Sequence, residues 1–142
     1  MKRKLAQFGL LLLMVSCKTY TISPENFKKQ FVTDNANKLT DVRIDNPLST
    51  LSDIKYQANS LKYLNVYDKN GKLSFIRNSP STEIRVTLIN GKKKIFYLDT
   101  VVLENDTLKG SKSRLLGITD KVPFNHIVKI EVQDGRKNYY NK

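Results

Sequence analysis

Residues 82–97 read Thr-Glu-Ile-Arg-Val-Thr-Leu-Ile-Asn-Gly-Lys-Lys-Lys-Ile-Phe-Tyr, and this stretch decides the fold class. From Ile84 to Leu88, apolar and polar residues alternate as they do in a strand with one buried face. Asn90-Gly91 is a strong signal for a type I′ hairpin turn. Pairing outward from that turn sets Val86 opposite Ile95, so both strands place apolar residues on one face. The stretch therefore predicts an antiparallel hairpin.

The flanking sequence predicts further strands. A second hairpin is expected where residues 61–67 and 73–77 flank the polar turn Asp68-Lys69-Asn70-Gly71. Residues 93–104 are apolar on both faces, which favours either a central strand of two layers or a strand bent across a small barrel. The end of the chain, with a strand over residues 122–132 and a hairpin signal at Asp134-Gly135, is loosely similar to small barrels of the pleckstrin-homology-like or SH3-like kind.

One short helix precedes the strands. Ser23 is a good N-cap, Pro24 suits the first helical position, and Phe27 and Phe31 share one face. The helix is expected to stop near Asp34-Asn35. The predicted fold is mainly β (α+β), a small antiparallel barrel or sandwich of about six to eight strands with one short N-terminal helix.

Residues 36–60 give a weaker pattern. Residues 42–44 suggest a short strand that Asn46-Pro47 ends. Leu48, Leu51 and Ile54 fit either one turn of helix or core contacts made from a loop.

The N-terminal sixteen residues have the layout of a secretory signal. A basic start, Lys2-Arg3-Lys4, precedes an apolar run over residues 5–15 that is well short of the roughly 20 residues of a spanning helix. The end of this run, Met14-Val15-Ser16-Cys17, resembles the lipobox of bacterial lipoproteins. That resemblance implies cleavage before Cys17 and attachment of acyl chains, palmitate among them, to its sulfur and amino group. The alternative is an ordinary secretory peptide with an incidental cysteine.

The resemblance also predicts the domain organisation and the location. Cys17 is the only cysteine of the chain, so it has no internal disulfide partner. We expect residues 1–16 to be a signal peptide, 17–22 a lipidated tether, and 23–142 a single β-rich domain. Lys18 is neither the Asp that retains enterobacterial lipoproteins at the inner membrane nor part of an acidic surface-export run, which favours the periplasmic face of the outer membrane.

The chain is strongly basic. It holds 25 Lys and Arg against 13 Asp and Glu, and residues 1–16 contain three of the basic residues and no acidic one, so the remainder carries 22 against 13, a net charge of +9. An exported protein does not meet nucleic acid, so we expect no nucleic-acid partner. Two clusters could bind anions and are expected near opposite ends of the strand over residues 93–104: Lys92, Lys93, Lys94, and Lys109, Lys112, Arg114.

The sequence contains no recognisable catalytic constellation. His126 is the one histidine, no nucleophile elbow accompanies it, and one His with no second Cys predicts neither a metal site nor a cofactor. We therefore expect a lipid-anchored envelope protein whose β domain binds a partner or has a structural role. The expected partners are the membrane, through acyl chains on Cys17, and another envelope protein. The alternatives are a periplasmic hydrolase with two carboxylates and a binder of anionic lipid or polysaccharide.

Overall fold

The computed structural model describes residues 18–46, 48, 49 and 51–134, and it confirms a mainly β fold. The described residues form eleven strands, more than the six to eight that we predicted. The helical elements are α2 (Pro24–Thr33), η2 (Leu98–Thr100) and η3 (Phe124–His126). The strands are β1 (Thr19–Ile22), β2 (Leu39–Asp45), β3 (Asp53–Asn59), β4 (Tyr63–Tyr67), β5 (Leu73–Arg77), β6 (Thr82–Leu88), β7 (Lys93–Tyr97), β8 (Val102–Glu104), β9 (Thr107–Ser113), β10 (Ile118–Pro123) and β11 (Ile127–Asp134).

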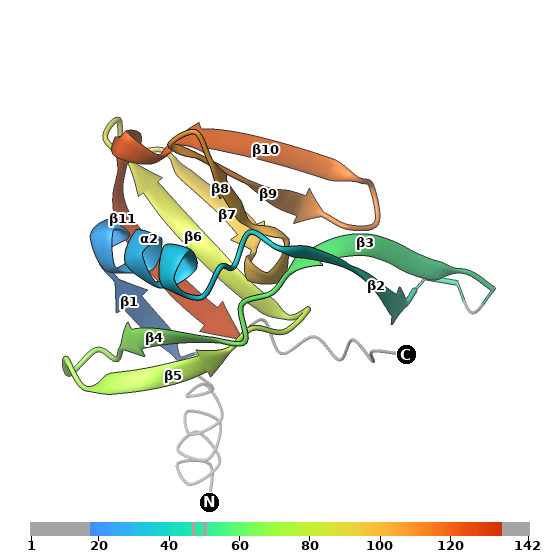
Figure 1. Cartoon of the computed structure of the whole chain (residues 1–142), viewed down its shortest axis with the longest axis horizontal. Coiled ribbons are helices and arrows are strands. Elements are labelled where there is room, and N and C mark those ends of the chain that lie inside the picture. Colours follow the sequence, from blue (N-terminus) through green and yellow to red (C-terminus); the bar gives the residue numbers. More distant parts are fainter. Residues whose placement is uncertain (1–17, 47, 50, 135–142) are drawn as a thin grey trace, which may run out of the picture.

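The strands form three antiparallel sheets. The largest has the order β5-β4-β1-β11-β6-β7, the second the order β10-β9-β8, and the third consists of β2 and β3. Figure 1 shows the β8–β10 sheet at the top, the β4–β5 hairpin at the bottom and α2 between them. Side chains from the two larger sheets and from α2 share one hydrophobic core, so these elements are one folded unit.

The expected helix is confirmed. The Ser23 hydroxyl accepts a hydrogen bond from the Asn26 N–H at 3.2 Å, and Phe27 and Phe31 stack at 4.7 Å and are buried. At its end, Asn35 adopts a left-handed φ of 49° and donates to Val32, while the Ala36 N–H donates to the Phe31 carbonyl. This is a Schellman motif, which satisfies carbonyls that a helix end otherwise leaves unpaired.

The folded domain begins earlier than predicted. Thr19–Ile22, assigned to the tether from the sequence, is strand β1 and pairs along its length with β11, while Thr21 also faces Tyr67 of β4. The β-branched and aromatic side chains of Thr-Tyr-Thr-Ile favour this extended, paired state. Lys18 is thus the single residue between Cys17 and the first strand.

The β6–β7 hairpin forms, but its predicted register is wrong by one residue. Val86 faces Lys94 instead of Ile95, and Ile84 faces Phe96. The Gly91 N–H donates to the Leu88 carbonyl and Gly91 has a φ of +80°, so a three-residue loop with a bulged glycine replaces the type I′ turn. The shift turns Phe96 into the core, where it is fully buried.

The long apolar stretch after this turn bends, as one of the two predicted alternatives requires. The turn η2 separates β7 from β8, so one half of the stretch lies in each of the two larger sheets. Gly110 of β9 crosses this corner closely, because a Cβ there would lie 3.0 Å from the Phe96 ring and 3.2 Å from Val101. A glycine is therefore needed where β9 passes over the bend.

Large apolar side chains are exposed at two places in the fold. Leu48 and Leu51 lie in the connection of the β2–β3 hairpin and are exposed, so they are neither a helical turn nor core contacts. This hairpin extends away from the rest of the domain (Figure 1). In a regular strand Val128 would share the buried side of β11 with Ile130 and Val132, but a bulge between Ile127 and Lys129 turns it outward. The hairpin signal at Asp134-Gly135 lies partly outside the described residues.

The buried side chain of Asn59 joins the β2–β3 hairpin to the core. Its amide nitrogen donates to the carbonyls of Leu98 at 2.7 Å and Val101 at 2.8 Å. Its oxygen accepts from the Leu61 N–H at 3.2 Å and from the Asn78 amide at 2.8 Å. Two donors and two acceptor positions are the full capacity of an Asn side chain, so Asn59 is saturated.

The substitution Asn59→Asp tests this connection. A carboxylate has no proton for the Leu98 and Val101 carbonyls and places a charge in a buried position, so the free energy of unfolding should fall by at least about 3 kcal/mol. Urea denaturation measures the change. Asn90→Asp is the matched control, because only the oxygen of Asn90 is used, accepting from the Lys92 N–H at 3.0 Å. The control should stay within about 0.5 kcal/mol, and equal losses in both variants would contradict the assignment.

Candidate binding groove

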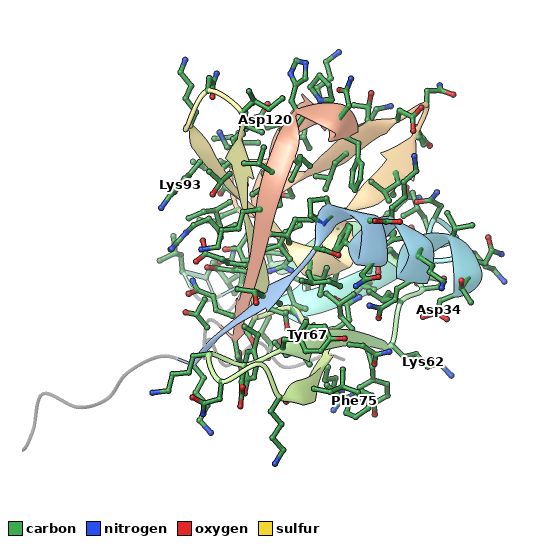
Figure 2. All side chains as sticks on the ribbon, turned by 90° about the vertical axis from the view of Figure 1, so that its left-hand side faces the viewer. Asp34, Lys62, Tyr67, Phe75, Lys93 and Asp120 are labelled. Atoms are coloured by element: carbon green, nitrogen blue, oxygen red, sulfur yellow. The ribbon has the colours of Figure 1, made fainter. Side chains whose placement is uncertain are left out.

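A groove of about 1030 Å³ lies between α2 and the β4–β5 hairpin. Its apolar lining comes from the two strands: Tyr63, Tyr67, Leu73 and Phe75. Its polar lining includes side chains of α2 and of the strand ends: Asn26, Lys29, Gln30, Asp34 and Lys62. Figure 2 shows Asp34 at the helix end and, below it, Lys62 just before β4, Tyr67 on β4 and Phe75 on β5.

The apolar lining is exposed because of the strand alternation. Leu64, Val66 and Ile76 point into the core, so the residues between them point to solvent. The solvent-facing set is large and apolar, with exposed fractions of 57 % for Tyr63, 41 % for Tyr67, 50 % for Leu73 and 66 % for Phe75. A contiguous exposed apolar surface of this kind, with a polar rim, is typical of an interaction site.

One wall of the groove is held in place by a side-chain amide. The Gln30 amide nitrogen donates to the Asn65 carbonyl at 3.1 Å, and the Asn65 N–H donates to the Gln30 oxygen at 2.8 Å. A side-chain amide carries the same donor and acceptor pair as a backbone peptide, so Gln30 occupies the position of a neighbouring strand beside β4. Two hydrogen bonds fix α2 against β4 and so hold this wall of the groove in place.

The other wall ends in a strand edge. β5 is the last strand of the six-stranded sheet on this side. In the β4–β5 hairpin, the Asp68 N–H donates to Lys72 and the Asn78 N–H donates to Lys62, which sets the bonding pairs at every second residue. The N–H and C=O groups of Leu73 and Phe75 therefore point outward along this edge, whereas the Arg77 carbonyl accepts a hydrogen bond from the Thr82 hydroxyl at 2.8 Å. An edge with outward backbone groups is a template for another extended chain.

A second cleft, of about 640 Å³, lies between β3 and the β8–β10 sheet. Beside it, Arg114 is buried with only 3 % of its side chain exposed, and it pairs with Asp99. Its guanidinium lies 3.8 Å from the centre of the Tyr97 ring and 4.8 Å from that of Tyr56. The Tyr56 hydroxyl donates to Asp99, and burial together with this carboxylate raises the pKa of Tyr56 above its ordinary value. Arg114, a predicted anion ligand, is thus part of an internal ion pair.

The remaining predicted anion ligands lie in different environments. Lys94 and Lys112 both contact Asp120, at 2.9 Å and 3.0 Å, although we expected their clusters at opposite ends of one strand. The bend at η2 causes the difference, because it folds β9 back beside β7. Lys109 pairs with Glu104 at 2.8 Å. Lys92 and Lys93 are exposed in the β6–β7 turn region.

The geometry favours binding over proton transfer. Each of the four main cavities of the described residues is lined by a single carboxylate: Asp34, Asp120, Asp68 and Asp134. Hydrolysis by paired carboxylates needs two of them facing one substrate, so these cavities give that alternative no support. His126 is exposed at the end of η3.

Sequence reasoning missed the groove residues. The signal was present, because residues 63–67 and 73–77 are apolar at positions of both parities, which is unusual for strands with one solvent face. What no sequence pattern shows is that α2 lies beside these strands, since that placement depends on the Gln30 contact.

The Asp120 ion pairs predict a dependence of stability on pH. Hydrogen bonds from Lys94 and Lys112 lower the pKa of Asp120 from 3.8 to about 2. As pH falls, the Asp120 carboxylate takes up a proton in the unfolded chain before it does so in the folded protein. The ion pairs therefore stabilise the fold fully above a pH of about 4, and this stabilisation is lost as the pH falls from about 4 to 2. Asp120→Asn should remove this component from urea unfolding curves recorded between pH 5 and 2. Asp41→Asn, on the exposed part of β2, should retain it, and parallel curves for all three proteins would contradict the prediction.

Known proteins give no indication of the function of this chain. The chain matches no protein-family model, no curated protein and no solved structure. Over the described ranges, no helix is both long and apolar enough to cross a membrane. In the same part of the chain, no three His, Cys, Asp or Glu side chains gather in the way that a metal ion requires.

Proposed function

We propose that the protein is a lipid-anchored bacterial envelope protein whose β domain is a non-catalytic binding module. The observation that carries the proposal is the preformed apolar groove between α2 and β4–β5. The proposed partner is an extended segment of another envelope protein that carries acidic residues. The proposed location is the periplasmic face of the outer membrane.

The anchor is supported by the sequence around Cys17 and by the position of the first strand. Met14-Val15-Ser16-Cys17 is similar to a lipobox, and Cys17 has no second cysteine to pair with. β1 begins at Thr19 and pairs with β11, so the domain starts directly after the attachment residue. Two or three acyl chains, as bacterial lipoproteins carry, are enough for stable attachment.

The nature of the partner is inferred from the two walls of the groove. The outward N–H and C=O groups of Leu73 and Phe75 suit the backbone of an added strand. Side chains of such a strand would contact the exposed Leu73 and Phe75. Lys29 and Lys62 outnumber Asp34 in the lining, which favours a partner with acidic residues.

Acylation is tested by labelling the full chain in bacteria with a radioactive or clickable palmitate analogue. We expect label in the membrane fraction of cells that express the natural sequence, and none for Cys17→Ser, because no other cysteine is present. Ser16→Ala is the matched control and should keep the label. Equal labelling of the natural protein and Cys17→Ser would refute the anchor.

The groove is tested by photo-crosslinking in intact cells. A photoreactive phenylalanine analogue at Phe75 should form an adduct with one polypeptide, and the same analogue at Ile95, an exposed position on β7 at the other edge of the sheet, should not.

The crosslinked segment is then synthesised as a peptide and titrated against the purified protein. Phe75→Ser should raise the Kd at least about tenfold, since it removes a large apolar contact, whereas Ile95→Ser should leave it unchanged. Adducts of equal strength from both positions, or a segment without acidic residues, would contradict the proposed partner.

A further inference from the structure

The end of the domain that holds Lys18 also holds the turn of the β4–β5 hairpin. β1 runs antiparallel to β4 with Thr21 opposite Tyr67, so the residues before Thr21 lie beside those after Tyr67. A cavity of about 620 Å³ between the two segments is lined by Lys18, Lys69, Lys72 and Asp68, among others. Residues far apart in the sequence thus form one surface next to the proposed site of acylation.

This surface is positively charged and its lysines are accessible. Lys18, Lys69 and Lys72 are exposed, and no ion pair found among the described residues involves them. The one carboxylate of the cavity lining, Asp68, is occupied by the turn, because it accepts N–H groups of Asn70 at 2.8 Å and Lys72 at 2.9 Å. Backbone hydrogen bonds of Lys72 and Asn70, together with the charges of Lys72 and Lys18, lower the pKa of Asp68. Three exposed lysines therefore surround one carboxylate, which leaves this surface with a net positive charge.

The lysines of the β6–β7 turn lie at the opposite end of the sheet. β11 pairs with Leu88 at Ile127 and with Thr19 at Gln133. Six residues of strand separate these pairs by about 20 Å, which is more than twice the Debye length in physiological salt. Figure 2 shows Lys93 at the upper left of the domain and Tyr67, at the end of β4 next to the β4–β5 turn, in the lower half.

We infer that the surface formed by Lys18, Lys69 and Lys72 rests on anionic phospholipid headgroups in the acylated protein. The inference rests on the proposed acylation of Cys17. Only Lys18 separates Cys17 from β1, so the surface stays within about 10 Å of the bilayer. At that distance the negative surface potential of anionic headgroups attracts its lysines. The exposed Leu73 beside the turn adds an apolar contact at the interface.

This contact would orient the binding groove. β4 and β5 run away from the turn toward the pair Tyr63 and Arg77. With the turn on the headgroups, that pair lies at the end of the groove farther from the membrane. The edge of β5 then stands away from the bilayer and is open to a partner.

Two matched turns provide the test. Asn70 and Asn90 both precede a glycine of positive φ in a three-residue hairpin loop, one at each end of the sheet. Asn70→Cys and Asn90→Cys are each purified as the acylated full chain, labelled with a fluorophore and reconstituted into vesicles of phosphatidylglycerol and phosphatidylcholine that contain a headgroup quencher. We expect quenching at least about threefold stronger at position 70 than at position 90.

Charge reversal separates the headgroup contact from simple proximity. In the Asn70→Cys protein, Lys69→Glu with Lys72→Glu should reduce quenching at least about twofold, and so should raised salt or pure phosphatidylcholine. Lys92→Glu with Lys93→Glu, the same change at the other end, should have no effect. Equal quenching at the two turns, or quenching that does not change with the charge of the lipid, would overturn the inference.

The unmodified chain distinguishes the two possible failures. If Cys17 is acylated, the natural protein takes up no thiol-reactive fluorophore, because it has no other cysteine. Labelling of the natural protein would refute the anchor and the inference that depends on it. Absence of label together with equal quenching at positions 70 and 90 would refute the headgroup contact and leave the anchor standing.

Discussion

Four hydrogen bonds to one buried side chain connect the parts of this fold that no sheet connects. Asn59 ends β3, donates to both carbonyls that flank the η2 corner, and accepts from Leu61 and from Asn78 after β5. The protruding β2–β3 hairpin, the bend between the two larger sheets and the base of the β4–β5 hairpin therefore share one residue. A saturated amide suits this position, because an apolar side chain would leave two carbonyls and one N–H without these partners.

Side-chain amides also replace missing strands on both sides of the core. Gln30 completes the edge of β4, and Asn37 does the same for β8, donating to the Leu103 carbonyl at 2.6 Å and accepting its N–H at 2.8 Å. The segment that contains α2 is thus fastened to a strand of each larger sheet. Such contacts satisfy backbone groups that would otherwise invite a further strand at those edges. The edge of β5 has no such contact with α2, because the Gln30 amide pairs with β4.

The features that the sequence could predict are those set by neighbouring residues. The caps of α2, the alternation in β6 and the positions of the turns at Asn70-Gly71 and Asn90-Gly91, though not the type of the second turn, depend on contacts within a few positions. The register of β6 with β7 was missed because both registers give an alternating pattern, and the choice is made by burial of Phe96 in a core built from distant strands. The ion pairs of Arg114 and the groove beside Gln30 likewise depend on packing between segments far apart, which no local pattern records.

The place of β1 in the sheet has a consequence for how the chain folds. β1 lies between β4 and β11, so its register with Gln133 joins nearly the two ends of the domain. Contacts of such high sequence separation slow folding, because loop closure comes before any gain from pairing. The six-stranded sheet cannot be completed until the final strand is available. A chain with this topology therefore stays unfolded longer after synthesis than one whose first and last strands pair only with near neighbours.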